Sequence, residues 1–146
     1  MIQFEKFQLD NGLKVLVHQD TSTPMAVVNV LYNVGAKDED PAKTGFAHLF
    51  EHLMFGGSVN IPVYDEPLQR AGGENNAYTT NDLTNYYCQI PAENIETAFW
   101  LESDRMLSLA FSKKSLEVQR KVVCEEFKEH YINKPYGDAW HKMRSL

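Results

Sequence analysis

The sequence predicts an α+β fold in which a mixed, largely antiparallel sheet is covered by helices. Three observations predict it: strand patterns fill the first part of the 146 residues, helical patterns fill the last part, and a second pair of strand patterns lies between them. With 43% hydrophobic residues the chain can bury a core, and its length suits one domain over residues 1–146.

Strand signals come first along the chain. Residues 4–9 and 13–18 flank Asp10-Asn11-Gly12, a turn sequence that predicts a β-hairpin. A third run, rich in β-branched residues, covers 26–34. These runs predict that the sheet begins here.

The middle of the chain alternates helix and strand signals. Residues 45–55 predict a helix that Gly56 and Gly57 end, and residues 64–71 predict a short second helix. Two further strands are predicted at 76–80 and 84–90. The helices are therefore expected to cover a sheet built from both groups of strands.

Two long helices are predicted in the last part. Pro91 starts the first, whose apolar positions recur broadly at helical spacing: Ile95, Phe99, Leu101, Met106 and Leu109. Ser112 or Ser115 caps the second, whose inward-facing positions are Leu116, Val122, Val123 and Phe127. Residues 138–146 resemble the opening of another helix, so we expect a domain that is incomplete at its C-terminus.

The most informative motif is His48-Leu49-Phe50-Glu51-His52. On a helix, His48 and His52 are four residues apart and share a face, and Glu51 lies beside them. This HxxEH spacing is typical of an inverted zinc motif, in which the histidines hold the metal and the glutamate is the base. The alternative is a helix whose histidines merely cap it or cover the core.

A catalytic zinc site needs one more protein ligand. Cys88 and Cys124 are far apart, form no CxxC pair and lie in apolar stretches, where a small buried hydrophobe is the commoner role. Better candidates are the carboxylates late in the second long helix. Their spacing alone leaves Glu125, Glu126 and Glu129 open.

Nearly the whole chain resembles the insulinase, pitrilysin and mitochondrial processing peptidase family of zinc peptidases. Residues 45–58 (GFAHLFEHLMFGGS) resemble the family's metal helix and the turn after it. Residues 72–86 (GGENNAYTTNDLTNY) are similar to its Gly-rich turn and NAxT strand, and residues 119–126 (QRKVVCEE) to the segment that ends in its third ligand. The resemblance implies the same α+β fold.

Carried over residue by residue, the resemblance implies that Glu126 is the third zinc ligand, 74 positions after His52 (126 minus 52). This interval is a few residues shorter than is usual in the family. The resemblance also implies that Asn76 and Ala77 contact an extended peptide substrate. Seven residues before its ligand the family usually has a second Glu, whereas this chain has Gln119, which can support the site by hydrogen bonding but carries no charge.

The predicted cofactor is one Zn²⁺ per chain, held by His48, His52 and Glu126 with a net charge near +1. Glu51 is the predicted base, which takes a proton from water and later returns one to the leaving amine. The predicted function is a zinc-dependent endopeptidase of extended or unfolded peptides, present here as its metal-binding part. The alternative is a non-catalytic zinc-binding or scaffolding half of a peptidase complex, which would need no Glu51.

The resemblance also implies partners, because family members are longer and have a second similar half that closes over the zinc domain. Besides the peptide substrate, we expect a C-terminal half missing from this chain or a homologous subunit. Low turnover by this chain alone is therefore expected. Self-association is also predicted if the apolar side chains of Trp140, Met143 and Leu146 are exposed.

Composition excludes other classes of partner. The net charge of −6, without a basic run or an Arg/Lys stripe, argues against nucleic acid. The sequence contains no apolar span of 18 residues and no signal-peptide pattern at its start, so no membrane partner is expected. Cytoplasm is favoured over periplasm, although a periplasmic protein whose signal had been removed would show the same pattern.

Overall fold

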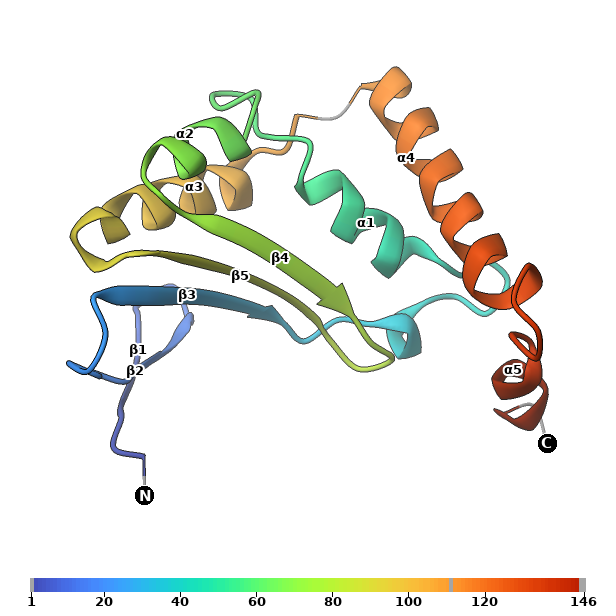
Figure 1. Ribbon diagram of the computed structural model, residues 1–146, viewed down its shortest axis with the longest axis horizontal. Coiled ribbons are helices and arrows are strands. Elements are labelled where there is room, and N and C mark those ends of the chain that lie inside the picture. Colours follow the sequence, from blue (N-terminus) through green and yellow to red (C-terminus); the bar gives the residue numbers. More distant parts are fainter. Residues whose placement is uncertain (1, 111, 145–146) are drawn as a thin grey trace.

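The computed structural model describes residues 2–110 and 112–144, and its strands form two antiparallel sheets (Figure 1). A hairpin pairs β1 (Glu5–Gln8) with β2 (Lys14–Val17) around the predicted turn. The second sheet contains β3 (Met25–Tyr32), β4 (Glu74–Thr79) and β5 (Thr84–Pro91) in the order β3–β5–β4. β4 is therefore an edge strand, paired on one side only.

The described part of the chain forms five α-helices, of which the first three lie along one face of the three-stranded sheet (Figure 1). They are α1 (Phe46–Met54), α2 (Asp65–Arg70), α3 (Ile95–Leu107), α4 (Lys113–Phe127) and α5 (Ala139–Arg144). In Figure 1, α1, α2 and α3 lie along the sheet, and α4 packs against α1 on the side away from α3. Within the described part of the chain, no helix is long and apolar enough to cross a bilayer.

Three short helical turns join these elements. They are the 3₁₀ turns η1 (Ala36–Asp38) and η2 (Ala92–Asn94) and a π-helical turn, η3 (Lys128–Ile132), that extends α4. The combination of antiparallel sheets and helices is the predicted α+β fold, which is confirmed.

The core lies between the second sheet and helices α2 and α3. Its largest fully buried side chains are Leu68, Cys88, Ile90 and Leu101. Strand alternation places Val28 and Cys88 opposite each other on the covered face, while Val27 and Leu31 of β3 are more than half exposed on the other face. The helix-covered face is thus the one on which this part of the chain builds its core.

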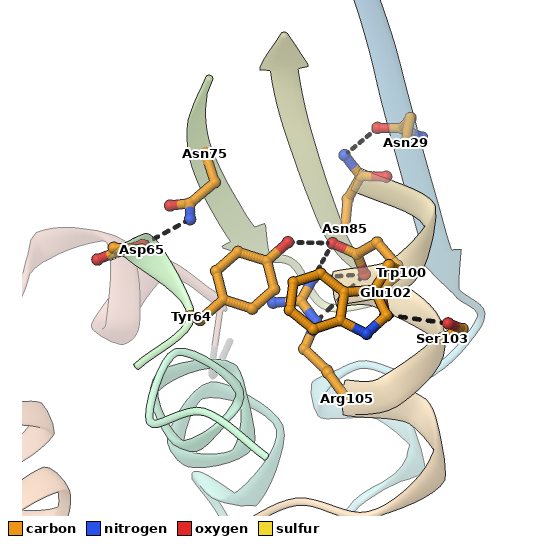
Figure 2. A network of polar contacts seen from close by, with 9 residues as sticks. All are labelled: Asn29, Tyr64, Asp65, Asn75, Asn85, Trp100, Glu102, Ser103 and Arg105. Atoms are coloured by element: carbon orange, nitrogen blue, oxygen red, sulfur yellow. Dashed lines mark hydrogen bonds and ion pairs between the residues drawn. The ribbon is translucent and has the colours of Figure 1, made fainter. Parts of the chain in front are cut away.

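A buried polar network crosses this core (Figure 2). Glu102 and Arg105 of α3 are 5% and 3% exposed, and the hydroxyl of Tyr64 donates to Glu102 Oε1 at 2.6 Å. The Arg105 guanidinium lies over the rings of Tyr64 and Tyr86. Burial, and secondarily the charge of Glu102, raises the pKa of the Tyr64 hydroxyl, so this hydroxyl stays a neutral donor.

The predicted helix faces are only partly correct. On α3, Leu101 is buried as predicted, but Phe99 and Met106 are 56% and 45% exposed. On α4, Val122 and Phe127 are also exposed, and no residue of the helix is buried, because its main neighbour is α1 rather than the sheet. A helix with one neighbouring element buries a narrower stripe than the sequence pattern suggests.

The starts of the two long helices can be compared with the predictions for Pro91 and Ser112. Pro91 is both the last residue of β5, paired with Met25, and the N-cap of η2, which leads into α3. The helical segment therefore starts at Pro91 as predicted, but its first turn is 3₁₀ and the α-helix begins at Ile95. Ser112 is the cap of α4, and its hydroxyl accepts from the Ser115 N–H at 3.1 Å. The C-terminal helix begins at Ala139 as expected.

Of the side chains predicted to support self-association, Met143 is 62% exposed. Leu146 and the side chain of Trp140 lie outside the described residues. Self-association therefore stays a prediction.

Candidate metal centre

Helix α1 carries the HxxEH motif, and a carboxylate from the loop before it fixes its first turn. Glu39 accepts from the backbone N–H groups of Gly45 and Ala47, each at 2.7 Å. Gly45 has φ +93°, a conformation that favours glycine, and it leads the chain into the helix. These bonds satisfy N–H groups that a helix start leaves open, so α1 begins at a defined residue.

His48 and His52 meet on one face of α1, as their spacing predicts. Their Nε2 atoms are 3.2 Å apart, and the ring planes are inclined by 71°. The side chain of His52 is 19% exposed and that of His48 is 43% exposed. Both ring nitrogens therefore point to one place at the surface of the fold.

Glu126 comes to this place from α4. Its Oε2 lies 3.5 Å from His48 Nε2 and 3.4 Å from His52 Nε2. Glu125 lies in an exposed ion pair with Lys128, at 2.7 Å. Among the described residues, His48, His52 and Glu126 are the only group of His, Cys, Asp and Glu whose ligand atoms lie within 4.8 Å of one another.

The spacing of these atoms fits a zinc ion. In tetrahedral coordination with bonds of about 2.0–2.2 Å, neighbouring ligand atoms are roughly 3.4 Å apart. The three separations here are 3.2, 3.5 and 3.4 Å. Two imidazoles and one carboxylate also match the donor set of a catalytic zinc, which leaves a fourth position open.

Glu51 is on the same helix, but its carboxylate makes a different contact. Its Oε2 accepts a hydrogen bond from the hydroxyl of Thr79, the last residue of β4. Both side chains are half-buried. The motif thus separates into two histidines grouped with Glu126 and one glutamate bound to the edge strand.

The residues predicted to contact substrate lie on the same edge strand. Asn76 is exposed and Ala77 is half-buried, and the Ala77 N–H donates to Asn76 Oδ1 at 2.8 Å. β4 contacts α1 and pairs with β5 alone, so its other edge carries backbone groups without a strand partner in the described part of the chain.

Gln119 lies on α4, seven residues before Glu126 and on the same side of the helix, because seven residues make about two turns. It is half-buried. In the described ranges its side chain makes no hydrogen bond, so a supporting role stays a prediction.

Sequence reasoning did not assign Thr79. Its position inside the NAxT segment was visible, but no local pattern links it to Glu51, 28 residues earlier. The contact depends on which strand forms the sheet edge nearest α1, and only the folded arrangement shows this.

Comparison with known proteins shows one consistent similarity. The family model described as "Insulinase (Peptidase family M16)" matches residues 14–142. A zinc protease of Helicobacter pylori, PqqE, is 35% identical over 142 residues, which cover 95% of this chain and 32% of that protein. Human insulin-degrading enzyme is 27% identical over 141 residues, which cover 94% of this chain and 13% of that enzyme.

Solved structures give the same result. A crystal structure of a Helicobacter pylori protease matches with a TM-score of 0.87 and 33% identity, over 94% of this chain and 33% of that one. Pitrilysin matches with a TM-score of 0.78 and 27% identity, over 88% of this chain and 14% of its own. The chain spans about a third or less of the length of these relatives.

Proposed function

Because the chain belongs to the insulinase family of peptidases, peptidase family M16, we propose that it is the metal-binding part of a zinc-dependent endopeptidase. The observation that carries this proposal is the convergence of His48, His52 and Glu126 at zinc-ligand spacing, with Glu51 on the same helix. Relatives that are named zinc proteases support it.

In the proposed mechanism, His48 and His52 offer neutral Nε2 atoms and Glu126 offers a carboxylate oxygen to one Zn²⁺. When bound, Zn²⁺ supplies Lewis acidity, which polarises a peptide carbonyl and makes a water ligand acidic near neutral pH. Glu51 accepts the proton of the attacking water and then delivers a proton to the nitrogen of the leaving amine. Thr79, bonded to Glu51 Oε2, leaves the other carboxylate oxygen for that transfer.

The proposed substrate is an extended or unfolded peptide that adds to the open edge of β4. An added strand bonds to backbone groups and so needs no particular side-chain sequence. The Ala77 N–H now donates to Asn76 Oδ1, and a peptide carbonyl could replace this acceptor. Asn76 and Ala77 are therefore the proposed substrate contacts.

A further part of the peptidase is proposed to complete the site. The three ligand side chains are 19–43% exposed, so this chain alone leaves the metal position open to solvent. Relatives include proteins named as a probable mitochondrial-processing peptidase subunit and as a cytochrome b-c1 complex subunit. We propose that residues 1–146 form one zinc-binding domain, closed by a further C-terminal half or by a homologous subunit, and that turnover without it is low.

Metal content tests the ligand set. Mass spectrometry of purified protein should find near-stoichiometric zinc in the wild type and in Glu51→Gln, none in His48→Ala, and less in Glu126→Gln. Glu125→Gln is the matched control, since Glu125 is exposed and paired with Lys128, and it should retain zinc. A wild type without zinc would overturn the metal site.

Cleavage of a quenched, unstructured peptide tests the reaction. Glu51→Gln should lower turnover by about 10²–10⁴-fold, the usual contribution of a general base. Undiminished cleavage by Glu51→Gln would remove this residue from the chemistry. Stoichiometric zinc without any cleavage, also when a homologous subunit is added, would instead favour the non-catalytic module.

A further inference from the structure

The carboxylate of Glu51 is held away from the ligand group although its position on α1 is close to it. Glu51 follows His48 by three residues and directly precedes His52, and residues three apart are neighbours on a helix. Yet the group of ligand atoms within 4.8 Å contains His48, His52 and Glu126, and Glu51 is bonded to Thr79 instead.

The donors and acceptors around Thr79 assign the direction of this hydrogen bond. Thr79 Oγ1 lies 3.4 Å from Thr84 Oγ1, and the hydroxyl of Thr84 donates to Val34 O at 3.0 Å. Each hydroxyl has one proton to donate, and the backbone carbonyl of Val34 can only accept. The hydroxyl of Thr84 therefore donates to Val34 O, and the hydroxyl of Thr79 donates to Glu51 Oε2.

The position of Thr79 on its strand is also fixed. Its Cα is paired with that of Thr84 in the β4–β5 register, and Thr84 is buried. Alternation puts Thr79 on the same face as Asn75 and Ala77, the face that α1 covers. As a β-branched residue in a strand, Thr79 has restricted χ1 freedom, so its hydroxyl has a defined direction.

We propose that Thr79 is a positioning residue that holds Glu51 on the substrate side of the site and keeps it from becoming an additional metal ligand. This inference rests on the proposed function, because it assumes that Glu51 is the base. A catalytic zinc needs an open position for water, and a free carboxylate beside His52 would compete for that position. Since Thr79 ends the strand that is proposed to bind the peptide, the same strand locates substrate and base.

Cobalt is the probe, because Co²⁺ can replace zinc and its visible absorption reports the number of ligands. The protein is loaded with Co²⁺, and Thr79→Val is compared with the wild type and with Thr79→Ser, which retains a hydroxyl. Thr79→Val should weaken and shift the absorption as a ligand is added, whereas Thr79→Ser should match the wild type. Thr79→Val/Glu51→Ala should match Glu51→Ala, because the effect passes through Glu51.

Turnover gives a second readout. Thr79→Val should lower kcat at least about tenfold and change KM less than twofold, because it alters the base and not the peptide edge. Thr79→Ser should restore kcat to within about threefold of the wild type. A Thr79→Val protein with wild-type absorption and wild-type kcat would overturn the inference.

The metal-free protein separates failure of this inference from failure of the proposed function. If the wild type binds no Co²⁺ or Zn²⁺, the proposed metal site fails. The thermal midpoints of the Thr79 and Glu51 variants then test whether Thr79 holds Glu51. A double variant Thr79→Val/Glu51→Ala that unfolds at the temperature of the less stable single variant supports the contact. If each single variant lowered the thermal midpoint by about 2–4 °C, as expected for one hydrogen bond, and the double variant lowered it by the sum, the contact between Thr79 and Glu51 would be overturned.

Discussion

Arg105 binds both carboxylate oxygens of Glu102, which precedes it by three residues on α3. Its Nη2 lies 2.6 Å from Oε1 and 2.7 Å from Oε2, and the two side chains are 3% and 7% exposed. Tyr64 donates to the same carboxylate, and the guanidinium lies 4.7 and 4.6 Å from the ring centroids of Tyr64 and Tyr86. Both buried charges are therefore compensated inside the core.

Removing Glu102 should show how strongly the buried charge of Arg105 depends on its counterion. Glu102→Ala leaves the Arg105 charge buried without a counterion, so the free energy of unfolding should fall by about 3–5 kcal/mol in urea titrations. The control is Glu117→Ala, whose ion pair with Arg120 is exposed, with side chains 58% and 57% exposed. Glu117→Ala should lower the free energy of unfolding by about 1 kcal/mol or less. Equal decreases in the free energy of unfolding for Glu102→Ala and Glu117→Ala would contradict a dependence of Arg105 on Glu102.

Asp104 should make stability depend on acid pH. Hydrogen bonds from the Ser58 hydroxyl, and then from the Asn60 amide at 2.8 Å, hold the pKa of this carboxyl below its ordinary value. Because the folded pKa is depressed, the ionised form is favoured by folding, and the resulting stability is present above about pH 4 and lost as pH falls through the folded pKa.

The test is the thermal midpoint between pH 6 and pH 2.5. Asp104→Asn should show a shallower decrease than the wild type over the acid part of this range. Asp10→Asn, in the exposed hairpin turn, removes the same charge without these hydrogen bonds and should follow the wild-type curve. If Asp104→Asn kept the full wild-type slope, other carboxyls would account for the acid lability.

The two cysteines should react at very different rates. Cys88 is fully buried on β5, and burial raises the pKa of its thiol, whereas Cys124 is exposed on α4. Since the thiolate is the reactive form, an aromatic disulfide reagent at pH 8 should modify Cys124 quickly and Cys88 only after unfolding. One thiol per chain should titrate in the native protein and two in urea. Rapid modification of both would mean that the core opens easily.

Much of the fold follows from local sequence signals. The Asp10-Asn11-Gly12 turn, the strand signal of β5 and the i, i+4 histidines each act over a few residues, and each lies where the sequence predicts. The three motifs that resemble the peptidase family also correspond to a real relationship, since its model matches residues 14–142. The roles of individual site residues stay predictions.

Features that depend on tertiary contacts were not predictable in this way. Charged residues on a helix are expected to face solvent, so the burial of Glu102 and Arg105 left no signal in the helical pattern. The prediction that Val122 and Phe127 face inward is wrong, because α4 packs mainly on α1 and not on the sheet. Spacing alone leaves Glu125, Glu126 and Glu129 open, and the family resemblance selects Glu126. Packing of α4 on α1 is what brings its carboxylate to the histidines.

Zinc should stabilise α4 more than any other part of the chain. α4 has no buried residue, and it shares the three proposed ligands with α1: Glu126 on one helix, His48 and His52 on the other. At a free zinc concentration of 100 times Kd, zinc binding should raise the free energy of unfolding by about 2.7 kcal/mol. For a chain of this size this corresponds to a rise in Tm of roughly 5–10 °C.

Hydrogen exchange locates that stabilisation. Amides of residues 113–127 should exchange up to about 100-fold more slowly with zinc, because opening of α4 then requires the loss of a ligand. Amides of the β1–β2 hairpin, which forms a separate sheet, should change little. In Glu126→Gln the protection of α4 should be strongly reduced, while any effect within α1 from the two histidines persists. Uniform protection over the whole chain, or none over α4, would show that the metal does not link these two helices.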